Sequence, residues 1–174
     1  MRLRSNRILD STAMALVLVV MAGVSAPPSL WAADSVRSSA VPSDANPGAG
    51  EGIAVGVTID TLGVPAPACL LVRYEGTLSW DPAVQSYVGH RGPLAGFTGS
   101  VTVDGAAGEI GFEGSQDAGG LGRMLVLEVT YEVVGSESES SLLDLDYTVM
   151  ENALADDLLP ILTVSDGQVT VLSP

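Results

Sequence analysis

Short runs of alternating apolar and polar residues, each closed by a turn-forming sequence, limit the fold of this chain more than any other feature. These runs lie at residues 53–59, 70–80, 96–103, 109–115, 123–134, 141–149 and 167–172. Glycine, proline, aspartate and serine are frequent in the segments between them. Alternation places successive side chains on opposite faces of a strand, so each run predicts a half-buried β-strand. Strands at this spacing indicate an antiparallel β-sandwich.

The run YEGTLSWDP, residues 74–82, shows how such a strand is built and how it ends. Its large side chains share one face and its small or polar ones share the other: Tyr74, Leu78 and Trp80 against Glu75, Thr77 and Ser79. The large set predicts a core-facing side, with Gly76 among it. Asp81 favours a turn and Pro82 lacks an amide hydrogen, so sheet pairing should stop there. The polar side chains are not needed for the core and could contact a binding partner.

The longest apolar run, residues 124–134, predicts a strand in the middle of a sheet. Its alternation assigns one set of side chains to the core: Leu125, Leu127, Val129, Tyr131 and Val133. Helix-like stretches are short and are confined to residues 83–88 and 151–159, so an all-β fold is favoured.

The first 33 residues look like a secretory signal peptide. Arg2, Arg4 and Arg7 precede an apolar run at residues 13–24, and small residues follow. This apolar run is shorter than the roughly 20 residues that span a bilayer, and a retained anchor is the alternative. Residues 34–49 are rich in serine, proline, alanine and glycine and predict a linker or a loose first strand. Residues 50–174 then form one domain.

Charge and cysteine content exclude several classes of protein. Without residues 1–33 the chain keeps four arginines, no lysine and 20 acidic residues, a net charge of −16, so nucleic acid is repelled. Cys69 is the only cysteine, so no intramolecular disulfide forms, and it lies too far beyond the apolar run to carry a lipid anchor. We expect a secreted protein, extracellular or periplasmic, with no membrane attachment after signal cleavage.

Catalytic and metal-binding groups are scarce in this sequence. His90 is the only histidine, so no triad or zinc site can be completed around it. Glu75 and Glu113 could lie on neighbouring strands, but glycoside hydrolysis also needs a cleft, which short loops on a flat sheet do not build. The segments ADDLL and SDG lack the spacing of an EF-hand loop, which leaves adventitious calcium as an open alternative. We expect no enzyme activity and no cofactor.

The order of these segments resembles the cohesin domain, the module of bacterial scaffolding proteins that captures dockerin domains. The segments that carry the resemblance cover residues 50–172: GEGIAVGVTID, YEGTLSWDPAVQSYVG, GEIGFEGS, GRMLVLEVTYEVVG, SLLDLDY and VSDGQVTV. The sequence departs from the cohesin pattern at Gly76, where a larger apolar residue is usual. The resemblance implies an all-β, nine-stranded antiparallel β-sandwich with jelly-roll topology.

In cohesins the dockerin docks on one flat sheet face, built from the third, fifth, sixth and eighth strands. The resemblance assigns these strands to residues 71–80, 97–103, 109–115 and 142–148. Alternation turns a polar set outward on them, which also includes Thr98, Ser100, Thr102, Glu109 and Thr148. The partner-binding residues that the resemblance implies are Glu75, Thr77, Ser79, Gly111, Glu113, Ser115, Asp144 and Asp146. We expect the four acids among them to cluster.

Other functions stay open at this point. A carbohydrate-binding module has a related architecture but needs exposed aromatic rings, and alternation leaves only Tyr87 plainly free. A structural or adhesive β-sandwich in a surface assembly is compatible with the same sequence. We favour a secreted, non-catalytic module that docks a dockerin-like protein in polysaccharide-degrading assemblies, with polysaccharide as the alternative partner.

Overall fold

The computed structural model describes residues 35–173, so the predicted signal peptide at residues 1–33 lies outside the described residues. Within the described range the chain forms ten strands and one short 3-10 helix: β1 (Ser35–Pro42), β2 (Gly52–Gly63), β3 (Leu71–Ser79), β4 (Gln85–Arg91), β5 (Val101–Asp104), β6 (Glu109–Gly120), β7 (Arg123–Val133), β8 (Ser140–Asn152), η1 (Leu159–Ile161), β9 (Leu162–Ser165) and β10 (Gly167–Thr170). Between Ser35 and Ser173 no helix combines the length and the hydropathy needed to cross a membrane.

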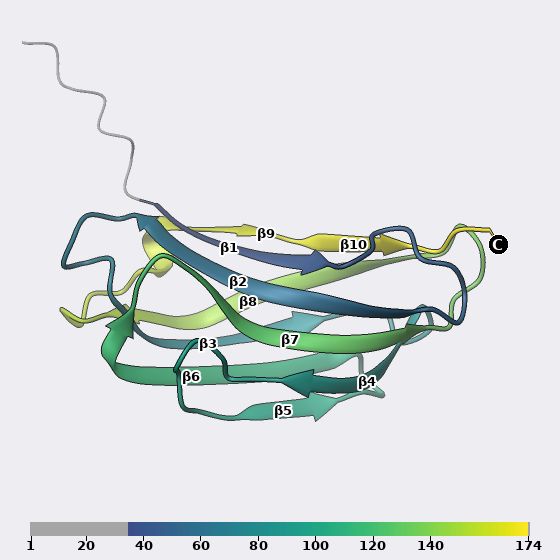
Figure 1. The fold of residues 1–174 in the computed structure, drawn as a ribbon, viewed down its shortest axis with the longest axis horizontal. Helices are drawn as coiled ribbons and strands as arrows, with labels where there is room; N and C mark the ends of the chain where they lie inside the picture. The colour runs from purple at the N-terminus through teal and green to yellow at the C-terminus, as the bar shows by residue number, and fades with distance from the viewer. Residues whose placement is uncertain (1–34, 174) are drawn as a thin grey trace, which may run out of the picture. The chain divides into compact units, whose positions relative to one another are not determined.

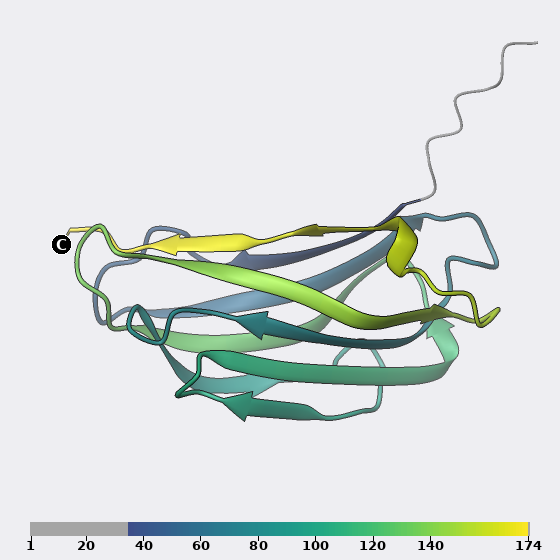
Figure 2. The ribbon, with the colours of Figure 1, turned by 180° about the vertical axis from the view of Figure 1, so that it is seen from behind.

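The strands form two five-stranded sheets that pack face to face (Figures 1 and 2). The first sheet has the order β4-β7-β2-β1-β9, and the second has the order β10-β8-β3-β6-β5. Strands pair in antiparallel fashion throughout, except that β1 runs parallel to β9. The predicted β-sandwich is confirmed, with ten strands in place of the nine expected.

Strand β1 is an integral part of the first sheet. The sequence had left two alternatives for residues 34–49, a linker or a loose first strand. Strand β1 pairs with β2 along one edge and with β9 along the other. Val36, Ser38 and Ala40 point into the sandwich and are almost fully buried. Serine and alanine give this segment little β-propensity of its own, so its neighbours on both sides determine its conformation. The folded sandwich therefore begins well before residue 50.

A bulge in β7 changes which of its side chains reach the core. The register with β2 shifts between Val57, which faces Leu127, and Thr58, which faces Leu125. Val126 is the extra residue, and both Val126 and Leu127 are buried. The prediction that Leu125 lies in the core is wrong, because the bulge reverses the alternation and leaves Leu125 37% exposed. The remaining core residues predicted for this strand are buried: Leu127, Val129, Tyr131 and Val133.

Strand β3 and the turn after it have the form that their sequence predicts. The large side chains are buried in the core: Tyr74, Leu78 and Trp80. Strand pairing ends at Ser79, and the Asp81 carboxylate accepts a hydrogen bond from the backbone N–H of Ala83 at 2.9 Å. This turn leads into β4, so residues 83–88 are not helical.

Gly76, the departure from the cohesin pattern, lies where two neighbouring rings leave little space for a side chain. Phe112 on β6 and Tyr147 on β8 meet edge to face, with ring centroids 5.8 Å apart. A Cβ atom added at Gly76 would lie 3.0 Å from an atom of each ring and 2.6 Å from the carbonyl oxygen of Asp146. The rings of Phe112 and Tyr147 thus fill the core volume next to Gly76.

Candidate docking surface

The outer face of the second sheet brings together the strands that the sequence assigned to partner binding. β8, β3, β6 and β5 are consecutive neighbours in the sheet (Figure 2). β5 is shorter than expected and spans only Val101–Asp104, although Thr98 still forms a bridge to Ser115 of β6. We call the outer face of these four strands the docking surface.

The partner-binding residues predicted from the sequence all lie on this face, and none of them is buried: Glu75, Thr77, Ser79, Gly111, Glu113, Ser115, Asp144 and Asp146. Strand register places them in rows that run across the sheet. Thr77 of β3 faces Asp146 of β8 on one side and Gly111 of β6 on the other. In the next row Ser79 lies between Asp144 and Glu109. The predicted acids are therefore held on adjacent strands.

A shallow depression of about 290 Å³ lies over Gly111, near the centre of the docking surface. Glu75 and Glu113 face each other directly across β3 and β6 and contribute to its wall. The Ser100 hydroxyl donates a hydrogen bond to Glu113 Oε1 at 2.8 Å, which holds that carboxylate at the rim. A Cβ atom at Gly111 would lie 2.9 Å from Thr102 Oγ1, so the missing side chain is what keeps the depression open.

The charge on this face is mostly negative, and Arg73 is the exception. Its Nη2 atom lies 3.9 Å from Glu75 Oε2, and both side chains are about half exposed, so this pair contributes little to stability. Asp104 faces Glu109 and Glu151 faces Arg73, which adds two more acids to the rows. A cationic partner group would meet several carboxylates here.

Sequence reasoning missed four residues of this surface: Arg73, Asp104, Leu142 and, beyond the register shift of β8 against β3, Glu151. The signal was present in the alternation, because Arg73 shares the parity of Glu75 on β3 and Leu142 shares the parity of Asp144 on β8. Leu142 is 56% exposed and faces Gln168 of β10, so it adds an apolar patch at one end of the surface. Such a residue could anchor a partner through apolar contact.

Tyr87, which the alternation left free for sugar stacking, is partly buried. Its ring lies against that of Trp80, with centroids 6.4 Å apart, and its hydroxyl is 2.6 Å from Nδ1 of His90. The expectation that Tyr87 is plainly free is therefore wrong. The Tyr87 hydroxyl and Nδ1 of His90 are hydrogen-bonded to each other, and Trp80 covers one face of the Tyr87 ring.

Titratable side chains are dispersed over the described surface. Among residues 35–173 no three His, Cys, Asp or Glu side chains gather in a way that could hold a metal ion. Glu75 and Glu113 are neighbours, as the sequence predicted, but they line an open depression on a sheet face.

The arrangement of strands and of this face can be compared with solved structures. A non-cellulosomal cohesin from the archaeon Archaeoglobus fulgidus superposes with a TM-score of 0.65 at 16% identity, over 80% of this chain and 92% of that chain. The chain has the cohesin fold. The third ScaC cohesin of Acetivibrio cellulolyticus, solved in complex with the ScaB dockerin, matches with a TM-score of 0.64 at 12% identity, over 79% of this chain and 99% of its own.

Cohesins of both interaction types share this fold. A type II cohesin domain from the cellulosome of Acetivibrio cellulolyticus matches with a TM-score of 0.60 at 13% identity, over 78% of this chain and 95% of its own. No family model and no curated protein sequence matches the chain. The cohesin fold is therefore built here from a sequence that shares few residues with the cohesins it superposes on.

Proposed function

We propose that this chain is a non-catalytic module that binds a dockerin-type protein through the docking surface. The observation that carries the proposal is the coincidence of the cohesin fold with an accessible polar face on β8, β3, β6 and β5. Cohesins of this fold have been solved in complex with dockerins, including the ScaC cohesin and a cohesin of Clostridium thermocellum OlpA.

The chemistry of the docking surface favours a basic partner. Glu75 and Glu113 flank the depression over Gly111, and Asp144 and Asp146 follow on the other side of β3. A lysine or arginine side chain seated in this depression would lie next to the paired carboxylates of Glu75 and Glu113, which gives charge-assisted hydrogen bonds. Short neighbours such as Thr77 allow the partner backbone to come close. Leu142 at the edge supplies an apolar contact next to the charges.

Export completes the proposal, since dockerin-type partners of extracellular assemblies are met outside the cell. The N-terminal segment of residues 1–33 carries the features of a signal peptide in its sequence. Sequencing the N-terminus of the secreted protein should place the mature end close to residue 34. A mature chain that retains residues 1–33 in the membrane fraction contradicts export.

Calorimetric titration of the purified protein with a panel of dockerins tests the binding proposal. We expect at least one dockerin to bind, and the double variant Glu113→Gln/Asp146→Asn to weaken that binding by about tenfold or more, as loss of close charge pairs does. The matched control is Glu132→Gln/Glu137→Gln, which removes the same charge from exposed positions outside the docking surface. Equal losses in both variants would show that net charge, not this surface, governs binding.

Soluble polysaccharides titrated in parallel separate the alternative functions. A carbohydrate-binding module binds a polysaccharide, keeps that affinity in the Glu113→Gln/Asp146→Asn variant and loses it with Tyr87→Ala. That result, without dockerin binding, rejects the proposal. Binding of neither class by the folded protein favours a structural or adhesive role.

A further inference from the structure

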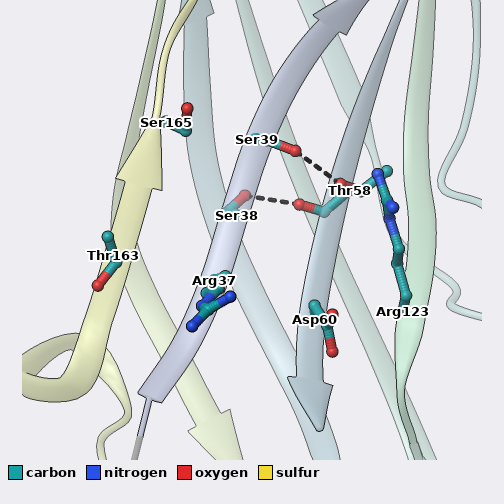
Figure 3. A pocket seen from close by; sticks show the side chains of 8 residues that line it. All are labelled: Arg37, Ser38, Ser39, Thr58, Asp60, Arg123, Thr163 and Ser165. Atoms are coloured by element: carbon teal, nitrogen blue, oxygen red, sulfur yellow. Dashed lines mark hydrogen bonds between the residues drawn. The ribbon is translucent and has the colours of Figure 1, made fainter. Parts of the chain in front are cut away.

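The outer face of the first sheet carries a second groove, on the side of the sandwich opposite the docking surface. It has a volume of about 260 Å³ and lies over β9, β1, β2 and β7 (Figure 3). Two rows of residues cross it in register. The first row is Thr163, Arg37, Asp60 and Arg123, and the second is Ser165, Ser39 and Thr58. We call this feature the Arg37–Arg123 groove.

Two of the four arginines of the described chain line this groove without an ion-pair partner. Arg73 and Arg91 each lie within 4.0 Å of a glutamate, whereas neither Arg37 nor Arg123 has a carboxylate of residues 35–173 within that distance. This is unexpected because Asp60 stands between them in register. The Asp60 carboxylate instead accepts a hydrogen bond from the backbone N–H of Leu62 at 2.9 Å.

The side-chain arrangement turns one guanidinium group towards the hydroxyl row. Figure 3 shows the side chain of Arg123 running along the sheet to the level of Thr58, away from Asp60. Ser39 Oγ and Thr58 Oγ1 are 2.9 Å apart and form a hydrogen-bonded pair on the floor of the groove. Thr163 and Ser165 of β9 are exposed and close the groove on the other side. The groove therefore holds a row of serine and threonine hydroxyls, with Arg37 in the neighbouring row and the end of the Arg123 side chain beside Thr58.

We propose that the Arg37–Arg123 groove binds an acidic sugar residue, with its carboxylate held by the arginines and its hydroxyls by the serine and threonine side chains. A guanidinium group matches a carboxylate in planar, two-point geometry, so two of them can hold one anionic group firmly. Serine and threonine hydroxyls both donate and accept hydrogen bonds, as sugar hydroxyls require. The groove is smaller than the roughly 300–1,000 Å³ of typical small-molecule sites, which suits one charged sugar unit.

Apart from Asp60, the acidic residues act against such a ligand from outside the groove. At about 0.15 M salt the Debye length is roughly 8 Å, so acids on the far sheet are screened while groups in the groove are not. Within the groove, two arginines and Asp60 leave one net positive charge. The site is also independent of the docking surface, because the two lie on opposite sheets.

Amide chemical shifts recorded by NMR during titration at about 0.15 M salt test this proposal. The probes are a galacturonate disaccharide, the matching neutral galactose disaccharide and inorganic sulfate. We expect the galacturonate disaccharide to shift the amides of Ser39, Thr58 and Thr163, and the neutral disaccharide to bind at least tenfold more weakly. The variant Arg37→Gln/Arg123→Gln should lose the galacturonate shifts.

The control variant is Arg91→Gln, which removes an exposed arginine of β4 that pairs with Glu128 outside the groove. It should bind galacturonate as the unmodified protein does. Three outcomes overturn the proposal: equal affinity for the neutral sugar, sulfate binding as tight as galacturonate binding, or no shift in the groove at millimolar ligand. An unchanged melting temperature of the double variant shows that its loss of binding is not a loss of folding.

Discussion

The hydroxyl of Tyr147 lies 2.7 Å from Oγ of Ser38, in a buried hydrogen bond that joins the two sheets. Ser38 Oγ also donates to the carbonyl oxygen of Thr58 at 2.8 Å. A serine hydroxyl has a single hydrogen, so Tyr147 must be the donor to Ser38. Tyr147 of β8 therefore donates to Ser38 of β1, and Ser38 donates to the carbonyl oxygen of Thr58 on β2.

Removing the Tyr147 hydroxyl should weaken the contact between the sheets by the value of one buried hydrogen bond. For Tyr147→Phe we expect a loss of about 0.5–1.5 kcal/mol in the free energy of unfolding, measured by denaturant titration. Ser38→Ala should cost more, because the buried tyrosine hydroxyl then has no acceptor. If the two losses add without coupling in the double variant, the hydrogen bond does not contribute to stability.

Buried tyrosines should also make the protein less stable at alkaline pH. Loss of solvent on burial raises the pKa of Tyr74, Tyr131 and Tyr147 above the ordinary value. Below about pH 10 these tyrosines are neutral in both the folded and the unfolded state, so their ionisation does not affect the free energy of unfolding. Above it the unfolded tyrosines ionise first, and stability falls as pH rises.

The expected slope is about 1.4 kcal/mol per pH unit for each tyrosine that ionises only on unfolding. Tyr147→Phe should make the decline between about pH 10 and 12 less steep, as denaturant titrations at several pH values will show. An identical slope in this variant contradicts the assignment of Tyr147 as a buried, neutral group.

The strand pattern and the outward face could be predicted from sequence because alternation depends on local geometry alone. Glu75, Thr77 and Ser79 lie on the outer face for that reason. Leu125 could not be placed, because the bulge at Val126 arises from pairing with β2 and leaves no mark in the β7 sequence itself. Strand β1 could not be recognised for a related reason: its conformation depends on pairing with β2 and with β9, and β9 is distant in sequence.

Trp80 should be among the most sensitive core positions. It is 5% exposed, packs edge to face on Tyr131 with centroids 5.0 Å apart, and donates from Nε1 to the carbonyl oxygen of Gln85 at 3.0 Å. Trp80→Ala should cost about 3–5 kcal/mol in the free energy of unfolding. A variant with an unshifted denaturation midpoint would show that the ring does not fill the core.

Adding a methyl group at Gly76 should destabilise the sandwich although the change is small. The new Cβ atom would meet the Asp146 carbonyl oxygen at 2.6 Å, and backbone cannot move aside as a flexible side chain can. We expect Gly76→Ala to cost about 1–3 kcal/mol in thermal or denaturant unfolding. Gly89→Ala is the control, since no atom lies within 4 Å of a Cβ at that position. Equal stability of the two variants contradicts the close packing described for Gly76.

Filling the depression over Gly111 should block partner binding without unfolding the protein. Thr102→Ala/Gly111→Val places a branched side chain in the depression, in the row next to the Glu75–Glu113 pair, and removal of the Thr102 hydroxyl makes room for it. We expect dockerin affinity to fall by about tenfold or more, as when a hot-spot pocket is lost. Thr102→Ala alone is the matched control and should retain binding. Retained binding in the double variant would place the contact elsewhere on the sheet.

The pairing of β1 with β9 has a consequence for the order in which the protein can fold. Val36 lies beside Leu162, so the first strand of the described chain stays half paired until nearly all of the sequence is available. Contacts between such distant segments slow folding, because a long loop must close before they stabilise anything. A chain cut short before β9 would also present the open edge of β1 to other chains, which invites aggregation. Completion of the first sheet is thus a late event that requires the whole domain.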